Sequence, residues 1–265
     1  MVNHLLIVKT LETINIEVRG LGQVVVDPAT IMVGNNSVVA RCRVAGKRGY
    51  RTIKCYIVSR YRGDMKGVTY YPKSLAVCGF SGSIVYVDVA ISSWVNGRAL
   101  DIVLQSGKYD IRMLSSQFDI MALRHLRRGV IHGDIKPENI IVLTSGKMKL
   151  VDSDELPIVV EGNCHAKYYG SESYTHPLRT LRRTDEFTDH YGLALISSFL
   201  AAAVHIPNLF DIKRPLDEYI SMVTDVLREH NDKSHYNLIV AMQNSIMGKI
   251  KGIVDIFESI VVADE

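Results

Sequence analysis

Five polar residues near the middle of the chain have the types and the spacing that phosphate chemistry needs. His132 and Asp134 end an apolar run, Lys136 follows two residues after the aspartate, Asn139 five residues after it, and Asp152 eighteen residues after it. A carboxylate can orient a hydroxyl and accept its proton, a cation neutralises a moving phosphoryl group, and amide and carboxylate oxygens are the ligands that Mg²⁺ prefers. Each residue alone is also typical of a turn or a helix cap, but the order and spacing of all five favour a phosphotransfer site.

This run resembles the catalytic loop of the protein kinases, H-R-D-x-K-x-x-N, and Asp152 falls where that family keeps the metal-binding aspartate of D-F-G. The resemblance implies that Asp134 orients the acceptor hydroxyl and receives its proton, while Lys136 neutralises the phosphoryl group in transit. It implies that Asn139 and Asp152 bind Mg²⁺ or Mn²⁺ together with the phosphates of ATP. The compact, divergent form of the motifs is similar to that of viral or pathogen-encoded kinases.

The same resemblance implies the fold class, α+β, as a protein-kinase-like two-lobed fold with a small antiparallel β lobe and a mainly helical lobe. We expect residues 1–90 to form the β-rich lobe with an N-terminal extension, and residues 91–265 the helical lobe with the catalytic loop and activation segment. Local patterns agree with this order of elements. Short apolar runs predict strands or an extended cap at 5–8 and 24–26, strands at 31–44, 50–58 and 74–91, and helices at 113–128, 215–229, 236–247 and 250–262.

A partial glycine loop and a lysine resemble the nucleotide-binding part of a kinase. Gly34 matches the second glycine of G-x-G-x-x-G-x-V, Val39 matches its valine, and Ser37 stands in place of the third glycine. Lys54 lies fifteen residues beyond Val39, which is the family spacing, and would hold the α- and β-phosphates of ATP. An exposed lysine on an edge strand is the plainer alternative.

The strand at residues 83–90 resembles the one that leads into the kinase hinge. By that alignment Val87 is the gatekeeper, and the Asp88 carbonyl and the Ala90 amide meet the edge of adenine. Ile141 joins the nucleotide-binding set by the same resemblance. A plain sheet strand, bonded only to its neighbours, explains residues 83–90 equally well.

Two departures from the family pattern bear on activity. The chain has no glutamate between residues 18 and 137, where the family keeps a helical glutamate that pairs with the lysine. We therefore expect a reduced helix in that region, with Asp64, Glu12 or Glu17 pairing with the lysine, or no pair at all. Ser153-Asp154 replaces the phenylalanine and glycine that follow the metal-binding aspartate.

Residues 170–178 resemble the end of the activation segment, G-T-x-x-Y-x-x-P-E. Ser171 would then bond the catalytic aspartate and lysine and select serine or threonine substrates. Asp189 matches the acid whose carboxylate caps the amides of the catalytic loop. Gly133 replaces the arginine of H-R-D, which implies no basic pocket for a phosphorylated loop. The arginines at 179–183 are either a site for an acidic or phosphorylated protein substrate or simply solvated.

Composition sets the remaining limits. The 265 residues are 47% hydrophobic and 22% charged, which is typical of an ordinary globular chain. The net charge of +3 is too small to indicate a nucleic-acid partner. No apolar run reaches the length of a membrane span and no signal peptide is recognisable at the start, so we expect an intracellular protein, cytoplasmic or nuclear. Four scattered cysteines indicate neither a zinc site nor a disulfide framework. The oligomeric state is not readable.

Three functions remain open from the sequence. The first is an ATP- and Mg²⁺-dependent serine/threonine protein kinase. The second is a pseudokinase that binds nucleotide or protein partners, because the glutamate is missing and D-F-G reads D-S-D. The third is a small-molecule kinase of the aminoglycoside or choline type, which favours H-G-D, although residues 136–139 and 170–177 argue against it.

Overall fold

The computed structural model describes residues 3–34, 37–57, 68–79, 81–152, 174, 186–206, 209–211, 215–246 and 248–263. The chain divides into two compact units, Met1–Val95 and Asn96–Glu265. Each unit has a buried apolar cluster of its own. The first unit is here called the barrel unit and the second the helical unit.

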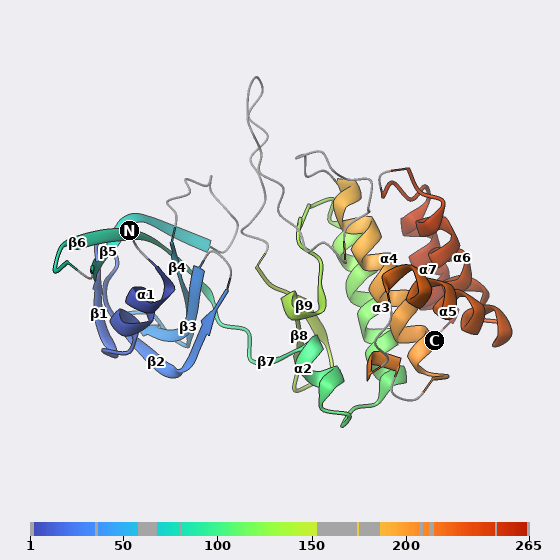
Figure 1. Cartoon of the computed structure of the whole chain (residues 1–265), viewed down its shortest axis with the longest axis horizontal. Coiled ribbons are helices and arrows are strands. Elements are labelled where there is room, and N and C mark those ends of the chain that lie inside the picture. The colour runs from blue at the N-terminus through green and yellow to red at the C-terminus, as the bar shows by residue number, and fades with distance from the viewer. Residues whose placement is uncertain are drawn as a thin grey trace, which may run out of the picture. The chain divides into compact units, whose positions relative to one another are not determined.

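The strands of the barrel unit form a closed antiparallel barrel in the order β1-β2-β3-β4-β6-β5 (Figure 1). Val18 pairs with Leu75, and this pairing joins β1 to β5 and closes the ring. Burial alternates along β1, as the pleat of a strand predicts, while β4 and β6 contain runs of consecutive buried residues. The strands are β1 (Asn15–Val18), β2 (Gly22–Val33), β3 (Ser37–Val44), β4 (Arg51–Tyr56), β5 (Val68–Cys78) and β6 (Ile84–Ser93).

The predicted fold class, a protein-kinase-like two-lobed α+β fold, is wrong. The N-terminal residues form a closed six-stranded barrel instead of the small β lobe that the resemblance implied. The physical reason is β1, which pairs with both β2 and β5 and so covers two strand edges that would otherwise be open to other chains. The reduced helix expected near Asp64 falls within residues 58–67, which lie outside the described residues.

The first apolar run is a helix and not a strand. Helix α1 (His4–Leu11) starts at Asn3, whose side chain accepts a hydrogen bond from the Leu6 amide at 3.1 Å. Ile7 and Leu11 are fully buried and lie four residues apart, so they share one face of the helix. That face joins the core of the barrel. A run of four apolar residues does not reveal this spacing, which explains the wrong prediction.

The helical unit contains a small antiparallel sheet, β7-β8-β9, and a helical bundle, with α2 and α3 between β7 and β8 in the chain (Figure 1). The predicted helix at 113–128 is confirmed as α3, and the predicted C-terminal helices are confirmed as α5, α6 and α7 with shifted ends. None of the described helices is both long and apolar enough to cross a membrane. The elements are β7 (Gly97–Ala99), α2 (Leu100–Gln105), α3 (Ile111–Arg127), η1 (Pro137–Asn139), β8 (Ile140–Leu143), β9 (Met148–Leu150), α4 (Glu186–Ala203), η4 (Leu209–Asp211), α5 (Leu216–Glu229), α6 (Lys233–Gln243) and α7 (Ile253–Ala263).

Candidate functional site

A buried carboxylate on α4 holds the start of the loop that carries Asp134. The backbone amides of His132 and Gly133 donate to the two oxygens of Asp189 at 2.6 and 2.8 Å. His125 on α3 lies 2.8 Å from the same carboxylate through its Nε2 atom. Asp189 is almost fully buried, and a buried carboxylate needs such partners to remain stable. The prediction that Asp189 caps the amides of this loop is confirmed.

The imidazole of His132 ties this loop to the strand that follows it. Its Nε2 lies 2.6 Å from the carbonyl oxygen of Val151, and its Nδ1 lies 3.3 Å from the amide nitrogen of Asp134. The amide must donate and the carbonyl must accept, so the ring is neutral with its proton on Nε2. Burial lowers the pKa of His132, although the charge of Asp189 opposes this, which agrees with a neutral ring.

Lys136 and Asn139 both bind the carboxylate of Asp134. The Nζ atom of Lys136 lies 2.7 Å from Asp134 Oδ2, and Asn139 Nδ2 donates to the same oxygen at 3.0 Å. Asn139 Nδ2 also donates to the backbone carbonyl of Asp134 at 2.8 Å. The carboxylate of Asp134 is therefore fixed in one orientation, and it is largely buried.

Asp152 is attached to the same loop through its neighbour. The amide of Val151 donates to the carbonyl of Asn139 at 2.9 Å, so Val151 contacts the loop through both its amide and its carbonyl. Asp152 itself is exposed and has a φ of 65°, a left-handed conformation that costs a non-glycine residue about 1 kcal/mol. The structure thus brings together the predicted residues Asp134, Asn139 and Asp152.

Close packing of α4 against this loop requires a glycine. A Cβ atom on Gly192 would lie 3.0 Å from Cβ and 3.1 Å from the carbonyl oxygen of Ile135. Few side chains tolerate such contacts without movement of the backbone. Gly192 follows Asp189 by less than one helical turn, so the helix that caps the loop can also lie directly against it.

Four of the predicted nucleotide-binding residues of the barrel unit lie on β3, on β4 and directly after β2. The amide of Gly34 donates a hydrogen bond to the carbonyl of Ser37 at 2.9 Å, which holds the end of β2 next to the start of β3. Val39 on β3 and Lys54 on β4 are directly paired, so their side chains share one face of the sheet. Lys54 is buried, and its Nζ lies 5.7 Å from the centre of the Tyr56 ring. It is therefore not the exposed edge-strand lysine of the plainer alternative.

Asp88 and Ala90 lie inside β6, which has neighbours on both sides. Ala90 pairs with Lys54 on β4 and with Tyr70 on β5. The carboxylate of Asp88 accepts hydrogen bonds from the Tyr70 hydroxyl and, at 2.7 Å, from the amide of Lys73. Ala90 is paired on both sides, so a base edge would have to displace its strand pairing, which favours the plain strand at this position. Asp88 is paired with Tyr56 on β4 and lies at the register shift between β5 and β6.

Ile141 lies in β8, where it pairs with Ala99 and Lys149 and is partly buried. Two residues before it, Asn139 ends the short helix η1. Ile141 is thus on the strand that leaves the Asp134 loop. The structure places it in the helical unit, while Gly34, Ser37 and Val39 belong to the barrel unit.

Several predicted positions lie outside the described residues. These are Ser171, the Ser153-Asp154 pair, Asp64 and the arginines between 179 and 183. Tyr174 is described and packs against the core of the helical unit. Burial, together with the nearby carboxylates of Glu138 and Asp101, raises the pKa of Tyr174 to about 12.

The sequence analysis missed His125, which completes the group around Asp189. It lies on the buried face of α3, in the stripe interpreted only as core. A histidine on an apolar helix seven residues before His132 was the available signal. A second missed cluster joins Asp119 of α3 to Ser197 of α4 and His235 of α6.

The donor set around Asp134 fits a magnesium nucleotide better than a metal held by protein alone. Among the described residues no group of three or more His, Cys, Asp or Glu side chains could hold a metal ion. Asn139 donates from Nδ2 to two oxygens of Asp134, and within the described part of the chain its Oδ1 accepts no hydrogen bond. Asn139 and Asp152 can supply two oxygen ligands, and Mg²⁺ commonly takes its remaining ligands from phosphates and water.

Comparison with known proteins gives one partial similarity. No protein-family model matches the chain. A stretch of 111 residues, 41% of the chain, is 32% identical to the serine/threonine-protein kinase PEPKR2 of Arabidopsis thaliana. The match covers 24% of that plant protein, so the chain spans about a quarter of the relative's length. The similarity supports a kinase-like relationship and says nothing about the organism from which this chain comes.

Proposed function

We propose that the chain is a phosphotransferase of the serine/threonine protein kinase type, which transfers the γ-phosphate of ATP to a protein hydroxyl. The observation that carries this proposal is the fixed carboxylate of Asp134, bound by Lys136 at 2.7 Å and by Asn139 at 3.0 Å on a loop held by Asp189. The similarity to a plant kinase supports it. The proposal rests on the geometry of this loop and not on the fold of the barrel unit.

The residues of the loop have separate roles in this reaction. The oxygen of a serine or threonine hydroxyl attacks the γ-phosphorus, the bond to the β-phosphate oxygen breaks, and ADP leaves. Asp134 orients the hydroxyl and takes its proton, since a carboxylate within hydrogen-bond reach can act as general base. Lys136, whose ammonium lies against Asp134, neutralises charge on the phosphoryl group as it moves.

Asn139 and Asp152 are the proposed ligands of Mg²⁺ or Mn²⁺. The amide oxygen of Asn139 and the carboxylate of Asp152 are hard donors, and the two backbone bonds of Val151 keep Asp152 next to the loop. The metal, when bound, shields the charge of the β- and γ-phosphates. By the same resemblance to the kinases, we assign nucleotide binding to Gly34 and Lys54 of the barrel unit. We assign the selection of hydroxyl substrates to Ser171, which lies outside the described residues.

Transfer of labelled phosphate tests the proposal. The full chain is incubated with γ-labelled ATP, Mg²⁺ and a mixture of protein substrates that includes acidic and phosphorylated proteins. Asp134→Asn keeps the size of the side chain but removes the base, so we expect transfer to fall at least about a hundredfold. Asp225→Asn is the matched control, because that carboxylate is exposed and pairs with Arg228 at the surface. Equal transfer by the wild type and Asp134→Asn contradicts the proposal.

A pseudokinase is the second candidate, and the missing glutamate between residues 18 and 137 favours it. The active kinase transfers phosphate and the pseudokinase does not, while both bind nucleotide. A nucleotide with Mg²⁺ that raises the melting temperature, without transfer above the Asp134→Asn level on any substrate, identifies the pseudokinase. Transfer to a small aminoglycoside or choline, and to no protein, identifies the small-molecule kinase.

A further inference from the structure

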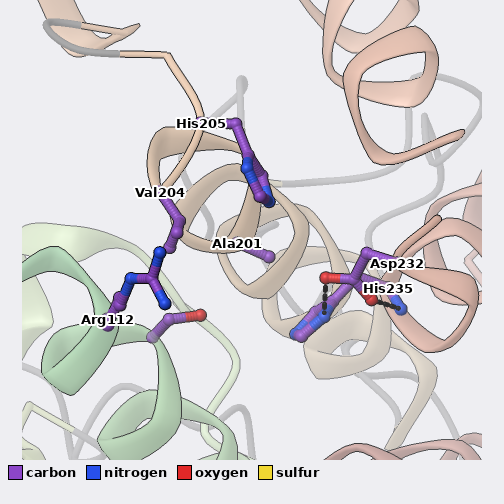
Figure 2. Close-up of a pocket in the computed structure, with 7 residues that line it drawn as sticks. Arg112, Ala201, Val204, His205, Asp232 and His235 are labelled. Atoms are coloured by element: carbon purple, nitrogen blue, oxygen red, sulfur yellow. Dashed lines mark hydrogen bonds and ion pairs between the residues drawn. The ribbon is translucent and has the colours of Figure 1, made fainter. Parts of the chain in front are cut away.

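A polar cavity in the helical unit contains none of the residues assigned to phosphotransfer. Its volume is about 250 Å³ (Figure 2). The cavity is formed by the first turns of α3, the C-terminal end of α4 with the turn that follows it, and the start of α6. The lining residues are Arg112, Ser115, Ala201, Val204, His205, Asp232 and His235.

One side of the cavity offers donors for an oxyanion. Arg112 and Ser115 are three residues apart on α3, so both side chains can face the same space. Among the described residues, neither the guanidinium of Arg112 nor the hydroxyl of Ser115 makes a hydrogen bond or ion pair within the protein. Ser115 lines the cavity and is 7% exposed, so a ligand in the cavity can reach its hydroxyl.

The other side of the cavity carries a net negative charge. His235 lies between Asp119, at 3.2 Å from its Nε2, and Asp232, at 2.9 Å from its Nδ1. Burial opposes protonation, but the hydrogen bonds to Asp119 and Asp232 dominate and raise the pKa of His235 to about 10. The ring is therefore an imidazolium at neutral pH, and the three groups together keep one negative charge. Of the two carboxylates, Asp232 lines the cavity.

His205 lies within the electrostatic reach of both sides. Its ring is stacked on His230 with centres 3.9 Å apart. Burial lowers the pKa of His205, the neighbouring His230 and Arg112 lower it as well, and Asp232 raises it. The ring is neutral at pH 7 and can accept a hydrogen bond from a cationic group. In Figure 2, Arg112 and Asp232 stand on opposite sides of the space, with Ala201 between them.

We propose that this cavity binds a small zwitterion of the α-amino acid type. Its carboxylate binds Arg112 and Ser115, its ammonium group binds Asp232 and His205, and its aliphatic part contacts Ala201 and Val204. A guanidinium can grip a carboxylate with two parallel hydrogen bonds, which fixes the orientation of the ligand. A ligand with only one of these two charges can pair with only one side of the cavity. Tight binding therefore requires both the carboxylate and the ammonium group.

Charge and size separate this ligand from simpler ones. Phosphate would meet Arg112 but would also meet the net negative charge around Asp232, which opposes a purely anionic ligand. The volume of about 250 Å³ lies below the range of about 300–1,000 Å³ typical of drug-sized ligands, and suits a molecule of a few heavy atoms. The alanine and valine in the lining favour an aliphatic side chain over a second charged group.

Calorimetric titration of the full chain with matched compounds tests this proposal. The probes are L-valine, isobutylamine, which lacks its carboxylate, 3-methylbutanoate, which lacks its ammonium group, and inorganic phosphate. We expect L-valine to bind at least about tenfold more tightly than any of the other three, because each charge-assisted contact contributes that much. Arg112→Gln should weaken L-valine binding at least about tenfold, and Ser115→Ala by a smaller factor.

Arg124→Gln is the control variant, since Arg124 is an exposed arginine on the same helix and does not line the cavity. It should bind L-valine like the wild type. Phosphate or 3-methylbutanoate binding as tightly as L-valine would overturn the proposal in favour of a simple anion site. Unchanged affinity in Arg112→Gln, with a circular dichroism spectrum and melting temperature like those of the wild type, would also overturn it, as would no binding at about 10 mM.

Discussion

The Asp134 loop and the barrel unit differ in what holds them in place. The loop is held by buried polar groups with few alternatives: Asp189 accepts two backbone amides, and His132 joins the loop to Val151. The barrel is held by apolar side chains and by ladder hydrogen bonds that many sequences can form, and Val18 and Leu75 close it. Specific polar contacts need particular residues at particular spacings, so they are visible in a sequence, while barrel closure is not.

The largest loss of stability should come from a substitution in the polar network that holds the Asp134 loop. Asp189→Asn leaves at least one buried amide without an acceptor and removes the charge that faces His125. We expect the helical unit to lose about 3–5 kcal/mol of stability, the cost of breaking a buried charged network. Denaturant unfolding followed by fluorescence or circular dichroism measures this. Asp225→Asn, at an exposed carboxylate, should change stability by no more than about 0.5 kcal/mol. A loss in Asp189→Asn no larger than in this control means that the network does not hold the loop.

The matching change in the barrel removes apolar contacts. Leu75→Ala truncates a side chain that is 2% exposed at the strand pair that closes the ring. We expect the barrel unit to lose about 2–4 kcal/mol, the usual cost of a cavity left by leucine. Hydrogen exchange should show faster opening of β1 and β5 and little change in α3 or α4. Uniform acceleration in both units would mean that the two regions do not unfold separately.

Two glycine substitutions compare how tightly the Asp134 loop and the barrel are packed. Gly192→Ala places a Cβ 3.0 Å from Ile135, and we expect a loss of about 1–3 kcal/mol despite the better helix propensity of alanine. Gly34→Ala in the barrel places its Cβ 3.6 Å from the nearest atom, an ordinary contact, and should cost no more than about 0.5 kcal/mol. Thermal unfolding of both variants checks this. Equal melting temperatures for the two variants would show that α4 does not press on the loop.

The smallest effect is a difference in pH dependence. The lowered pKa of His132 gives stability that is present above the unfolded value of 6.5 and is lost as the pH falls below it. The pKa of His235, raised from 6.5 to about 10, gives stability that is present below pH 6.5 and is lost as the pH rises through about 10. Each slope is at most about 1.4 kcal/mol per pH unit.

The barrel unit contains a single histidine, His4, so its stability should be nearly flat between pH 5 and 8 while that of the helical unit has a maximum near pH 6.5. Denaturant unfolding across this range measures both. His132→Gln should remove the loss of stability below pH 6.5, and His235→Gln should remove the loss above pH 6.5. These two results would assign each loss to its residue. A pH profile of the helical unit that neither substitution changes would contradict the assignment.

The sequence predicted the cap of the loop by Asp189 but not the closure of the barrel. Asp189 was identified as the cap because residues 188–194 resemble the kinase pattern D-x-W-S-x-G, and helix α3 followed from its apolar stripe. Leu6 and Ile7 were assigned to a strand because four apolar residues in a row fit both periods, and only the cap at Asn3 decides for a helix. Closure through Val18 depends on a long-range pairing that no local pattern contains.

Within the candidate site, the sequence also placed the end of the strand that carries Asp88 and Ala90 too early, at residue 90 or 91. Both lie within β6, which continues to Ser93 and pairs on both sides. The end of a strand is the least reliable part of a prediction from sequence, because the apolar pattern and the strand pairing need not end at the same residue. His125 was missed for the opposite reason, since a buried histidine in an apolar stripe gives the same pattern as core.

The most direct test of the account is a crystal structure of the full chain with Mg²⁺ and a non-hydrolysable ATP analogue. We predict Mg²⁺ at about 2.1 Å from the amide oxygen of Asn139 and from a carboxylate oxygen of Asp152. We also expect Asp134 to bind no metal and to keep its contact with Lys136. A nucleotide bound elsewhere, or a metal that contacts neither Asn139 nor Asp152, would contradict the assignment of this loop to phosphotransfer.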